Sequence, residues 1–411
     1  MSAAQGRDPA RWWLLGGVWM IYACFGLVVA SMAPLVPIIV EDLHLSLSAM
    51  GSILGAWPLV YILTAIPAGT FIDRVGLKLA LFIAALVIAC SGLLRGLAGG
   101  HASLFLAVAV FGIGGPLVSV GAPKLIAQYF SGVDRGTAMG IYLTGPSVGS
   151  LAALSLTHSV VMPAVGDSWR AVMLCYAAVG FAGAALWLAI AQFALKPQAQ
   201  DDAHPRAPES SRSVVSQLAR LPVLHASMCM GLCMFFFNQG LNSWVPAILR
   251  ASGMSLVHAG YWATIPVVVG IVASLVIPRR TPPELRFRVL LVLFVCGAGA
   301  TLCLHSTQPW LLGSGLVLQG ISRSVMMPLV MLVMMESRAI DPRHMGTAGG
   351  MFFSASEIGG VLGPLVSGFA ADVTGGFDAT LWVLASICVV MALLLGWLRR
   401  AAATAPLPAA A

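Results

Sequence analysis

Long apolar segments occupy almost the whole chain, and they constrain its fold more than any other feature. Twelve can be separated by charged and turn-forming residues, at positions 12–40, 49–72, 78–97, 104–129, 136–161, 169–195, 222–249, 258–277, 288–304, 310–335, 346–371 and 380–398. A helix needs roughly 20 apolar residues to cross a bilayer. Only 9% of residues are charged, against about 25% in soluble domains. The sequence therefore predicts an all-α membrane protein with twelve transmembrane helices and excludes a soluble globular protein.

The distribution of basic residues predicts the topology. With both termini in the cytoplasm, Arg95, Arg170 and Arg250 fall at the outer face, Lys124 and Arg323 fall within helices, and the other 17 of the 22 basic residues are cytoplasmic. Cytoplasmic loops of membrane proteins carry such an excess. The short loops favour a bacterial inner membrane. The net charge of +7 is explained by loops that face anionic lipid, so the lipid bilayer is an expected partner and nucleic acid is not.

The two halves of the chain resemble each other. The stretch RGTAMGIYLTGPSVGS at 135–150 matches MGTAGGMFFSASEIGG at 345–360, and a weaker match relates the residues around Ser46 and Gly51 to those around Ser255 and Gly260. We expect two pseudo-symmetric six-helix bundles, at 1–195 and 221–411, joined by a polar cytoplasmic linker at 196–220. Parallel repeats of this kind place the substrate site at the interface between halves, near mid-membrane.

A loop motif follows the second apolar segment. The sequence GTFIDRVGLKLAL at 69–81 resembles the G-x-x-x-D-R-x-G-x-K signature of the major facilitator superfamily at every specified position. Gly69 is expected to permit close helix contact, and Gly76 to allow the tight turn. The resemblance implies that Asp73 and Arg74 belong to a latch that holds the two halves in one state. The corresponding stretch of the second half, at 278–288, keeps the basic charge but lacks the glycines and the aspartate.

Other stretches resemble particular branches of the superfamily. NSWVPAIL at 242–249 and GGVLGPLVSGFAAD at 359–372 look like the cyanate and nitroimidazole permease branch, whereas GAPKLIAQYF at 121–130 resembles the choline- and haem-associated feline leukaemia virus receptor branch. The segment GPSVG at 145–149 resembles a Gly-Pro motif of antiporters. The same spacing of small residues also serves close helix packing, and packing is the preferred interpretation.

Ionisable residues inside apolar segments are candidates for function, because each costs at least ~2.5 kcal/mol at the bilayer centre. Arg323 lies thirteen residues from both Trp310 and Glu336, hence ~20 Å from either helix end. A guanidinium there suits a carboxylate or a small planar anion; the alternative is an internal ion pair. Glu357 has a similar depth on the next helix, so the two can approach one another. Glu357 would couple a proton to transport, or would simply accept structural hydrogen bonds.

Other polar residues have weaker signals. Lys124 lies about 9 Å from the end of its helix by helical rise and is expected to snorkel and join the latch. Asn238, Gln239 and Asn242 fall within one apolar segment, and these amides are expected to line the substrate pocket or to bond a neighbouring helix. Tyr61, four residues after Trp57, is expected to wall the pocket or to form part of an apolar packing stripe.

No cluster of His, Cys or carboxylate residues has metal-ligand spacing, and no nucleotide-binding loop or nucleophile elbow occurs. We therefore expect no metal, no cofactor and no enzymatic activity. The preferred hypothesis is a monomeric secondary active transporter of a small organic or inorganic anion, proton-coupled and working by alternating access. The alternatives are a proton-antiport exporter of drugs or hydrophobic metabolites, and an organic-cation facilitator.

Overall fold

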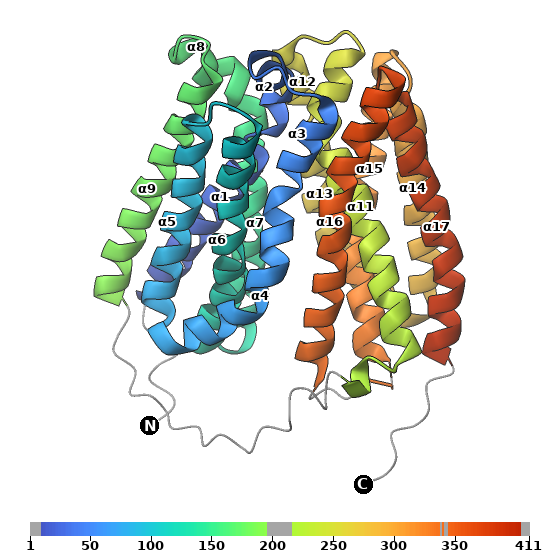
Figure 1. Ribbon diagram of the computed structural model, residues 1–411. Helices are drawn as coiled ribbons and strands as arrows, with labels where there is room; N and C mark the ends of the chain where they lie inside the picture. Colours follow the sequence, from blue (N-terminus) through green and yellow to red (C-terminus); the bar gives the residue numbers. More distant parts are fainter. Residues whose placement is uncertain (1–9, 195–215, 338, 341–343, 404–411) are drawn as a thin grey trace. The chain divides into compact units, whose positions relative to one another are not determined.

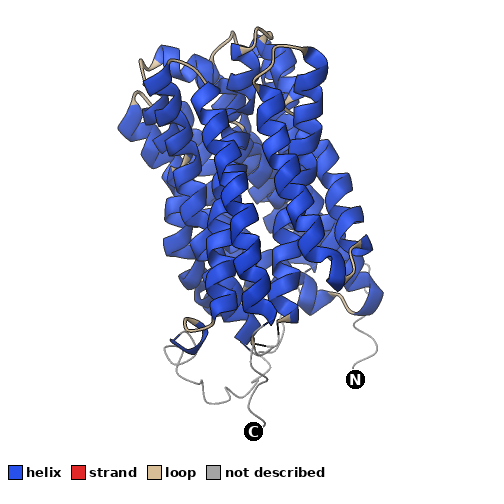
Figure 2. Ribbon diagram, turned by 90° about the vertical axis from the view of Figure 1, so that its right-hand side faces the viewer, coloured by secondary structure: helices blue, strands red, loops and turns tan. Residues whose placement is uncertain are grey.

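The computed structural model describes residues 10–194, 216–337, 339–340 and 344–403, and this part of the chain contains helices, turns and loops but no strand (Figures 1 and 2). The helices of the first half are α1 (Ala10–Ala30), η2 (Ala33–Leu35), α2 (Val36–Asp42), α3 (Leu47–Leu54), α4 (Ala56–Val75), α5 (Leu77–Gly96), α6 (His101–Tyr129), α7 (Gly132–Leu156), the π-helix η3 (Thr157–Val161), α8 (Met162–Ala164) and α9 (Trp169–Ala194). Those of the second half are α11 (Pro222–Ala251), α12 (Leu256–Trp262), α13 (Ile265–Arg280), η4 (Pro283–Leu285), α14 (Arg286–Leu304), α15 (Pro309–Glu336), α16 (Met345–Thr374) and α17 (Asp378–Ala403). The all-α prediction is confirmed.

Eleven segments of the described chain are long and apolar enough to cross a membrane. Several join neighbouring helices, as in the first, which runs through α1, η2 and α2 over Ala10–Asp42. Helix α11 is 30 residues long but is not among the eleven, and it carries the amides Asn238, Gln239 and Asn242. The described residues thus account for eleven predicted spans, and a twelfth at α11 stays a prediction.

The chain divides into two compact units. Unit 1 comprises the described residues of Met1–Gln198, Ser243–Arg250 and Met254–Thr264, and unit 2 those of Ala199–Asn242, Ala251–Gly253 and Ile265–Ala411. One end of α11 and all of α12 are therefore grouped with the first half, which sequence reasoning did not anticipate. Most of the predicted linker at 196–220 lies outside the described residues.

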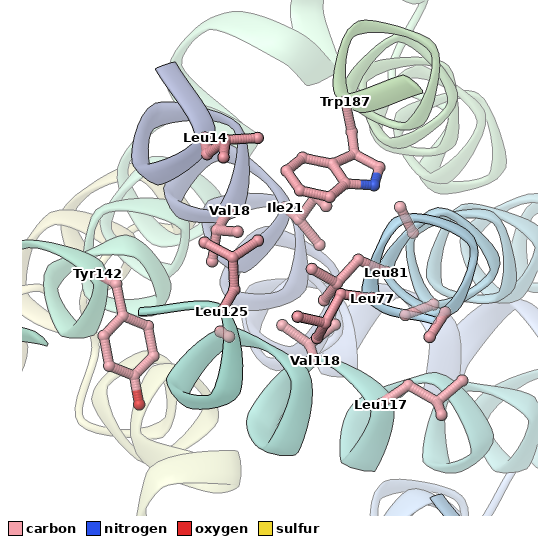
Figure 3. Packing of buried hydrophobic residues seen from close by; sticks show 14 of the residues in the cluster. Leu14, Val18, Ile21, Leu77, Leu81, Leu117, Val118, Leu125, Tyr142 and Trp187 are labelled. Carbon is pink, nitrogen blue, oxygen red and sulfur yellow. The ribbon is translucent and has the colours of Figure 1, made fainter. Parts of the chain in front are cut away.

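The interior of unit 1 is an apolar cluster to which helices α1, α5, α6, α7 and α9 contribute (Figure 3). Leu14, Val18 and Ile21, at helical spacing on α1, are wholly buried. Trp187 of α9 lies beside them, and its indole nitrogen donates a hydrogen bond to the carbonyl oxygen of Lys78 at 3.0 Å. Because a buried indole N–H needs an acceptor, this bond fixes the ring between α1 and α5.

The internal repeat appears in the structure as two matching helix crossings. A Cβ on Gly149 of α7 would collide with the carbonyl oxygen of Ala23 on α1, and a Cβ on Gly359 of α16 would collide with the carbonyl oxygen of Leu232 on α11. The weaker repeat also holds, because Ser46 and Ser255 are the N-caps of α3 and α12 and accept bonds from the backbone N–H groups three residues on. The predicted resemblance between halves therefore corresponds to shared backbone geometry.

The first helix is interrupted near Ser31, and two side chains satisfy the backbone there. Arg95, in the last turn of α5, donates to the carbonyl oxygen of Val28 at 2.6 Å. His158 of η3 donates through Nε2 to the carbonyl oxygen of Pro34 at 2.8 Å. The last carbonyls of a helix lack intrahelical donors and attract positive charge. The side chain of Arg95 is buried within unit 1, and its predicted place at the outer face of the membrane stays a prediction.

Candidate functional site

Arg323 lies in the middle of α15, fourteen residues after Pro309 and thirteen before Glu336. Its side chain is partly buried. Within the described chain the structure records no hydrogen bond, ion pair or ring contact for it, whereas Arg95 and Lys124 both have partners. An unpaired guanidinium inside a spanning helix is costly unless water or an anion meets it. Arg323 is therefore the strongest anion-binding candidate of unit 2.

Glu357 lies on α16 and is 5% exposed. Its Oε2 atom is buried and has no hydrogen-bond partner among the described residues. No ion pair joins it to Arg323, although both residues belong to unit 2 and lie within spanning helices. The neighbouring Ser356 lies against Gly231 of α11, so the crossing of α16 on α11 places Glu357 inside the unit.

Two amide side chains of unit 2 also carry buried oxygens without partners, namely Oδ1 of Asn238 on α11 and Oε1 of Gln319 on α15. Gln319 is 1% exposed and precedes Arg323 by four residues, so the two share a helix face. Gln239 and Asn242 are partly buried, and within the described chain neither makes a hydrogen bond. The expected bonding of these amides to a neighbouring helix is therefore not seen there, and pocket lining stays a prediction.

Unit 1 contains a group of aromatic and hydroxyl side chains on α1, α4, α6 and α7. Tyr61 on α4 shares a hydrogen bond with the Ser119 hydroxyl on α6 at 2.8 Å, and its ring meets Trp57 edge to face. Tyr22 of α1 stacks on Tyr142 of α7 with ring centroids 5.4 Å apart. Figure 3 shows the hydroxyl of Tyr142 pointing away from the apolar cluster. The interior of unit 1 thus contains aromatic rings and hydroxyl groups. That Tyr61 lines the substrate pocket stays a prediction.

The predicted latch residues lie in the last two turns of α4, at the single-residue turn between α4 and α5, and on α6. Gly76 has φ +80°, a backbone conformation that favours glycine, which accounts for the tight turn. Asp73 forms an ion pair with Lys124 of α6, so the structure brings together two residues that were assigned to the latch. Arg74 is exposed and has no hydrogen bond to another described residue. A Cβ on Gly69 would meet nothing within 4 Å, so the close helix contact expected at Gly69 is not found among the described residues.

Unit 2 has an ion pair at a similar place with the charges reversed. Arg286, at the start of α14, pairs with Glu336 at the end of α15. The Arg286 side chain is 9% exposed, whereas that of Lys124 is 36% exposed. This pair could not be predicted from the loop motif at 278–288, because Glu336 lies fifty residues beyond Arg286 at the end of α15.

The GPSVG segment packs against the first helix. A Cβ on Gly145 would lie 2.8 Å from the carbonyl oxygen of Trp19, and Gly149 contacts the backbone at Ala23. These contacts account for both glycines, in agreement with the packing interpretation.

In the part of the chain that the structure describes, no group of three or more His, Cys, Asp or Glu side chains is placed to hold a metal ion.

Sequence reasoning missed two polar residues of the interior. Arg95 stands near a helix end, where a long basic side chain usually reaches the membrane surface, and only the break in α1 shows its acceptor. Gln319 was overlooked because it is a single uncharged residue in an apolar helix. Its polarity, one turn before Arg323, was the signal that could have found it.

Comparison with known proteins supports a transport function. Residues 18–360 match the family described as Major Facilitator Superfamily. The chain is 24% identical over 383 residues to the hexuronate transporter of Bacillus subtilis (strain 168), which covers 87% of each chain. It is 22% identical over 439 residues to the protein named "Probable galactarate/D-glucarate transporter GudP" of Escherichia coli (strain K12), covering 92% of this chain and 91% of the relative.

A solved structure agrees in fold. The crystal structure of a bacterial homologue of the human lysosomal transporter Spinster, inward-facing and occupied, superposes with a TM-score of 0.72 at 18% identity and covers 97% of this chain and 96% of that one. The family match spans most of the sequence, and the named relatives are transporters rather than enzymes. The chain is therefore a multi-pass membrane transporter that belongs to the major facilitator superfamily.

Proposed function

We propose that this transporter carries a small carboxylate-like anion by alternating access, driven by a proton gradient. The observation that carries the proposal is Arg323, a guanidinium in the middle of α15 without a partner among the described residues. Its planar fork of donors matches a carboxylate with two parallel hydrogen bonds. A substrate that brings this anion offsets the cost of holding the charge within the membrane.

The relatives point to the same class of substrate. The two curated relatives described above are named for hexuronate and for galactarate and D-glucarate, all of which are carboxylates. Sequence identity near 23% does not carry a substrate from one transporter to another. It does support an organic acid, because the unpaired cation of this chain requires an anion on independent physical grounds.

Proton coupling is proposed for Glu357. An ionised carboxylate without a partner is costly in an apolar interior, and a bound proton removes the charge. Binding of the anion at Arg323 and of the proton at Glu357 adds no net charge to unit 2, which favours joint movement of both. Glu357 would therefore act in symport of one proton with the anion.

The alternatives fit the polar groups less well. In a proton-antiport exporter of hydrophobic solutes, Arg323 would be neutralised by Glu357, and the structure records no such pair. In an organic-cation facilitator, Arg323 would repel the substrate. The rings of Tyr22, Trp57 and Tyr61 suit a cation, but these rings also pack on one another and on neighbouring helices.

Replacement of Arg323 tests the anion proposal. Purified protein in proteoliposomes should take up D-glucuronate or a competing small carboxylate, and Arg323→Ala should lower uptake at least ~100-fold, since a lost charge-assisted pair costs about 3 kcal/mol. Arg323→Lys keeps the charge but not the fork, and should retain part of the activity. Undiminished carboxylate uptake by Arg323→Ala would reject the anion role.

Replacement of Glu357 tests coupling. Uptake by the unaltered chain should rise as the outer pH falls, because the proton enters with the anion. Glu357→Gln resembles the protonated acid and should abolish this pH dependence while anion exchange across the membrane continues. Ser147→Ala, at the repeat-related position, is the control and should keep the full pH dependence. A Glu357→Gln variant with an unchanged pH profile would remove Glu357 from coupling.

A further inference from the structure

Among the described residues of unit 2, four buried side-chain oxygens in helices have no hydrogen-bond partner. They are Oδ1 of Asn238, Oε1 of Gln319, Oε2 of Glu357 and Oγ of Ser367. Leaving a buried polar atom without a partner costs about 1–3 kcal/mol, so native proteins rarely do so without a reason. The amide oxygens of Asn238 and Gln319 can only accept hydrogen bonds. Acceptors are thus prominent among the unsatisfied groups of this unit, which also include Nε of Arg286 and Nε2 of His305.

Basic side chains that could neutralise an anion are fewer than these unpaired oxygens in the described chain. In the described chain, Lys124 and Arg323 lie within spanning helices and Arg95 is buried in the last turn of another, and two of these three basic residues already have partners. Lys124 pairs with Asp73, and Arg95 donates to Val28 and Ser31 while its guanidinium lies 5.5 Å from the centre of the Phe111 ring. Arg323 alone of these three remains without a described partner. One free cation can neutralise one anionic group.

Gln319 and Arg323 are placed to contact the same ligand, one as an acceptor and the other as a donor of hydrogen bonds. They are one helical turn apart on the same face of α15, so their Cβ atoms lie ~6 Å from each other. The guanidinium donates to a carboxylate, and the amide oxygen accepts from a donor close to that carboxylate. The hydroxyl group on the carbon next to a carboxylate has this spacing and this polarity.

We infer that the substrate is a hydroxylated monocarboxylate, that Arg323 binds its carboxylate, and that Gln319 accepts a hydrogen bond from an adjacent hydroxyl. The inference rests on the proposed anion transport and narrows it. A second carboxylate would meet buried acceptor oxygens without a cation to neutralise it, so dicarboxylates should be rejected. An unsubstituted fatty acid would leave the Gln319 oxygen unsatisfied, so it should bind weakly.

Two sets of ligands of matched chain length test the substrate class on the purified full-length protein. The three-carbon set is L-lactate, propionate and tartronate, and the six-carbon set is D-gluconate, hexanoate and D-glucarate. Binding is measured by titration calorimetry. In whichever set fits the site, the hydroxy monocarboxylate should bind at least ~10-fold more tightly than the unsubstituted acid and than the dicarboxylate, because one unsatisfied buried group is worth about that factor.

Gln319→Leu tests the residue assignment. It should weaken binding of the preferred hydroxy acid ~10-fold and leave the unsubstituted acid of the same length unchanged, so that the two bind alike. Ser314→Ala on the same helix is the control, since the Ser314 hydroxyl bonds to the Trp310 carbonyl within its own helix, and it should keep the full discrimination. If Gln319→Leu does not fold, the comparison of ligands on the unaltered chain still decides the substrate class.

The outcomes separate the two proposals. Equal binding of the hydroxy acid and the unsubstituted acid, or tight binding of a dicarboxylate, would overturn the inference while anion transport stands. Undiminished discrimination in a folded Gln319→Leu variant would overturn the role of Gln319. If neither set binds, while a quaternary amine or a lipophilic drug does, the proposed anion function itself fails.

Discussion

Units 1 and 2 share their helix crossings and differ in their interior chemistry. Gly149 and Gly359 bring α7 onto α1 and α16 onto α11 through the same backbone contacts. At one pair of positions that the repeat relates to one another, unit 1 has the hydroxyl of Ser147 and unit 2 has the carboxyl of Glu357. Each crossing leaves no room for a side chain larger than that of glycine, whereas the polar groups of the two units differ.

The difference extends to how each unit satisfies its polar atoms. The buried cation of unit 1, Arg95, has a carbonyl, a hydroxyl and an aromatic ring around it, although its Nε atom has no partner among the described residues. The buried groups of unit 2, including Gln319 and Glu357, have oxygens left over. A satisfied group stabilises a fold, and an unsatisfied group is available to a ligand. Because the unpaired buried oxygens of the described chain lie in unit 2, we propose that unit 2 supplies most of the contacts to the ligand.

The largest expected effect tests the shared crossings. Gly149→Ala and Gly359→Ala each force a methyl group onto a backbone carbonyl and should destabilise the protein by about 3 kcal/mol, the upper part of the usual range for overpacking. Thermal unfolding of the purified variants measures the loss. Gly140→Ala and Gly350→Ala are repeat-related controls at which a Cβ meets nothing within 4 Å. They should be neutral or slightly stabilising. If only one of the two variants Gly149→Ala and Gly359→Ala were destabilised, the two helix crossings would not be equivalent.

The second prediction compares the two membrane-embedded arginines. Arg95→Met removes donors from Val28 and Ser31 and should cost about 1.5–3 kcal/mol of stability. Arg323→Met removes a charge without a described partner and should leave the unfolding temperature unchanged or raise it, while carboxylate binding is lost. The same thermal measurement with and without carboxylate reads both effects. Equal destabilisation by the two variants would show that Arg323 has a structural role.

The smallest effect concerns the ion pairs at the helix ends. Asp73 and Lys124 are 65% and 36% exposed, and exposed pairs contribute about 0–1 kcal/mol, so Asp73→Asn should change stability very little. Glu336→Gln leaves the buried Arg286 without its anion and should cost about 1 kcal/mol more. Unfolding at low and high salt provides the measurement. A larger loss for Asp73→Asn than for Glu336→Gln would contradict this ranking.

Much of the fold could be predicted from the sequence because hydropathy and segment length are local properties. The helices, the repeat at 135–150 and 345–360, and the turn at Gly76 all follow from residues close together in the chain. The membrane-embedded Arg323 and Glu357 stood out because charge is rare among apolar residues. These signals need no knowledge of which helices touch.

Other features depend on contacts between distant segments. The burial of Arg95 follows from the interruption of α1, the pairing of Asp73 with Lys124 from the crossing of α4 and α6, and the grouping of α12 with unit 1 from packing on α7 and η3. Gln319 became a candidate only when its amide oxygen proved to lack a partner. Sequence patterns give the type of each residue, but satisfaction of a polar atom is a three-dimensional property.

The glycine crossings also bear on how such a chain holds together without water. Inside lipid, apolar surfaces gain little by leaving their surroundings, so cohesion between helices depends on how closely their backbones can approach. Gly149 and Gly359 allow that approach by having no side chain, and a hydropathy profile gives them almost no weight. These glycines therefore govern the assembly of each half, although a search for hydrophobic segments would not detect them.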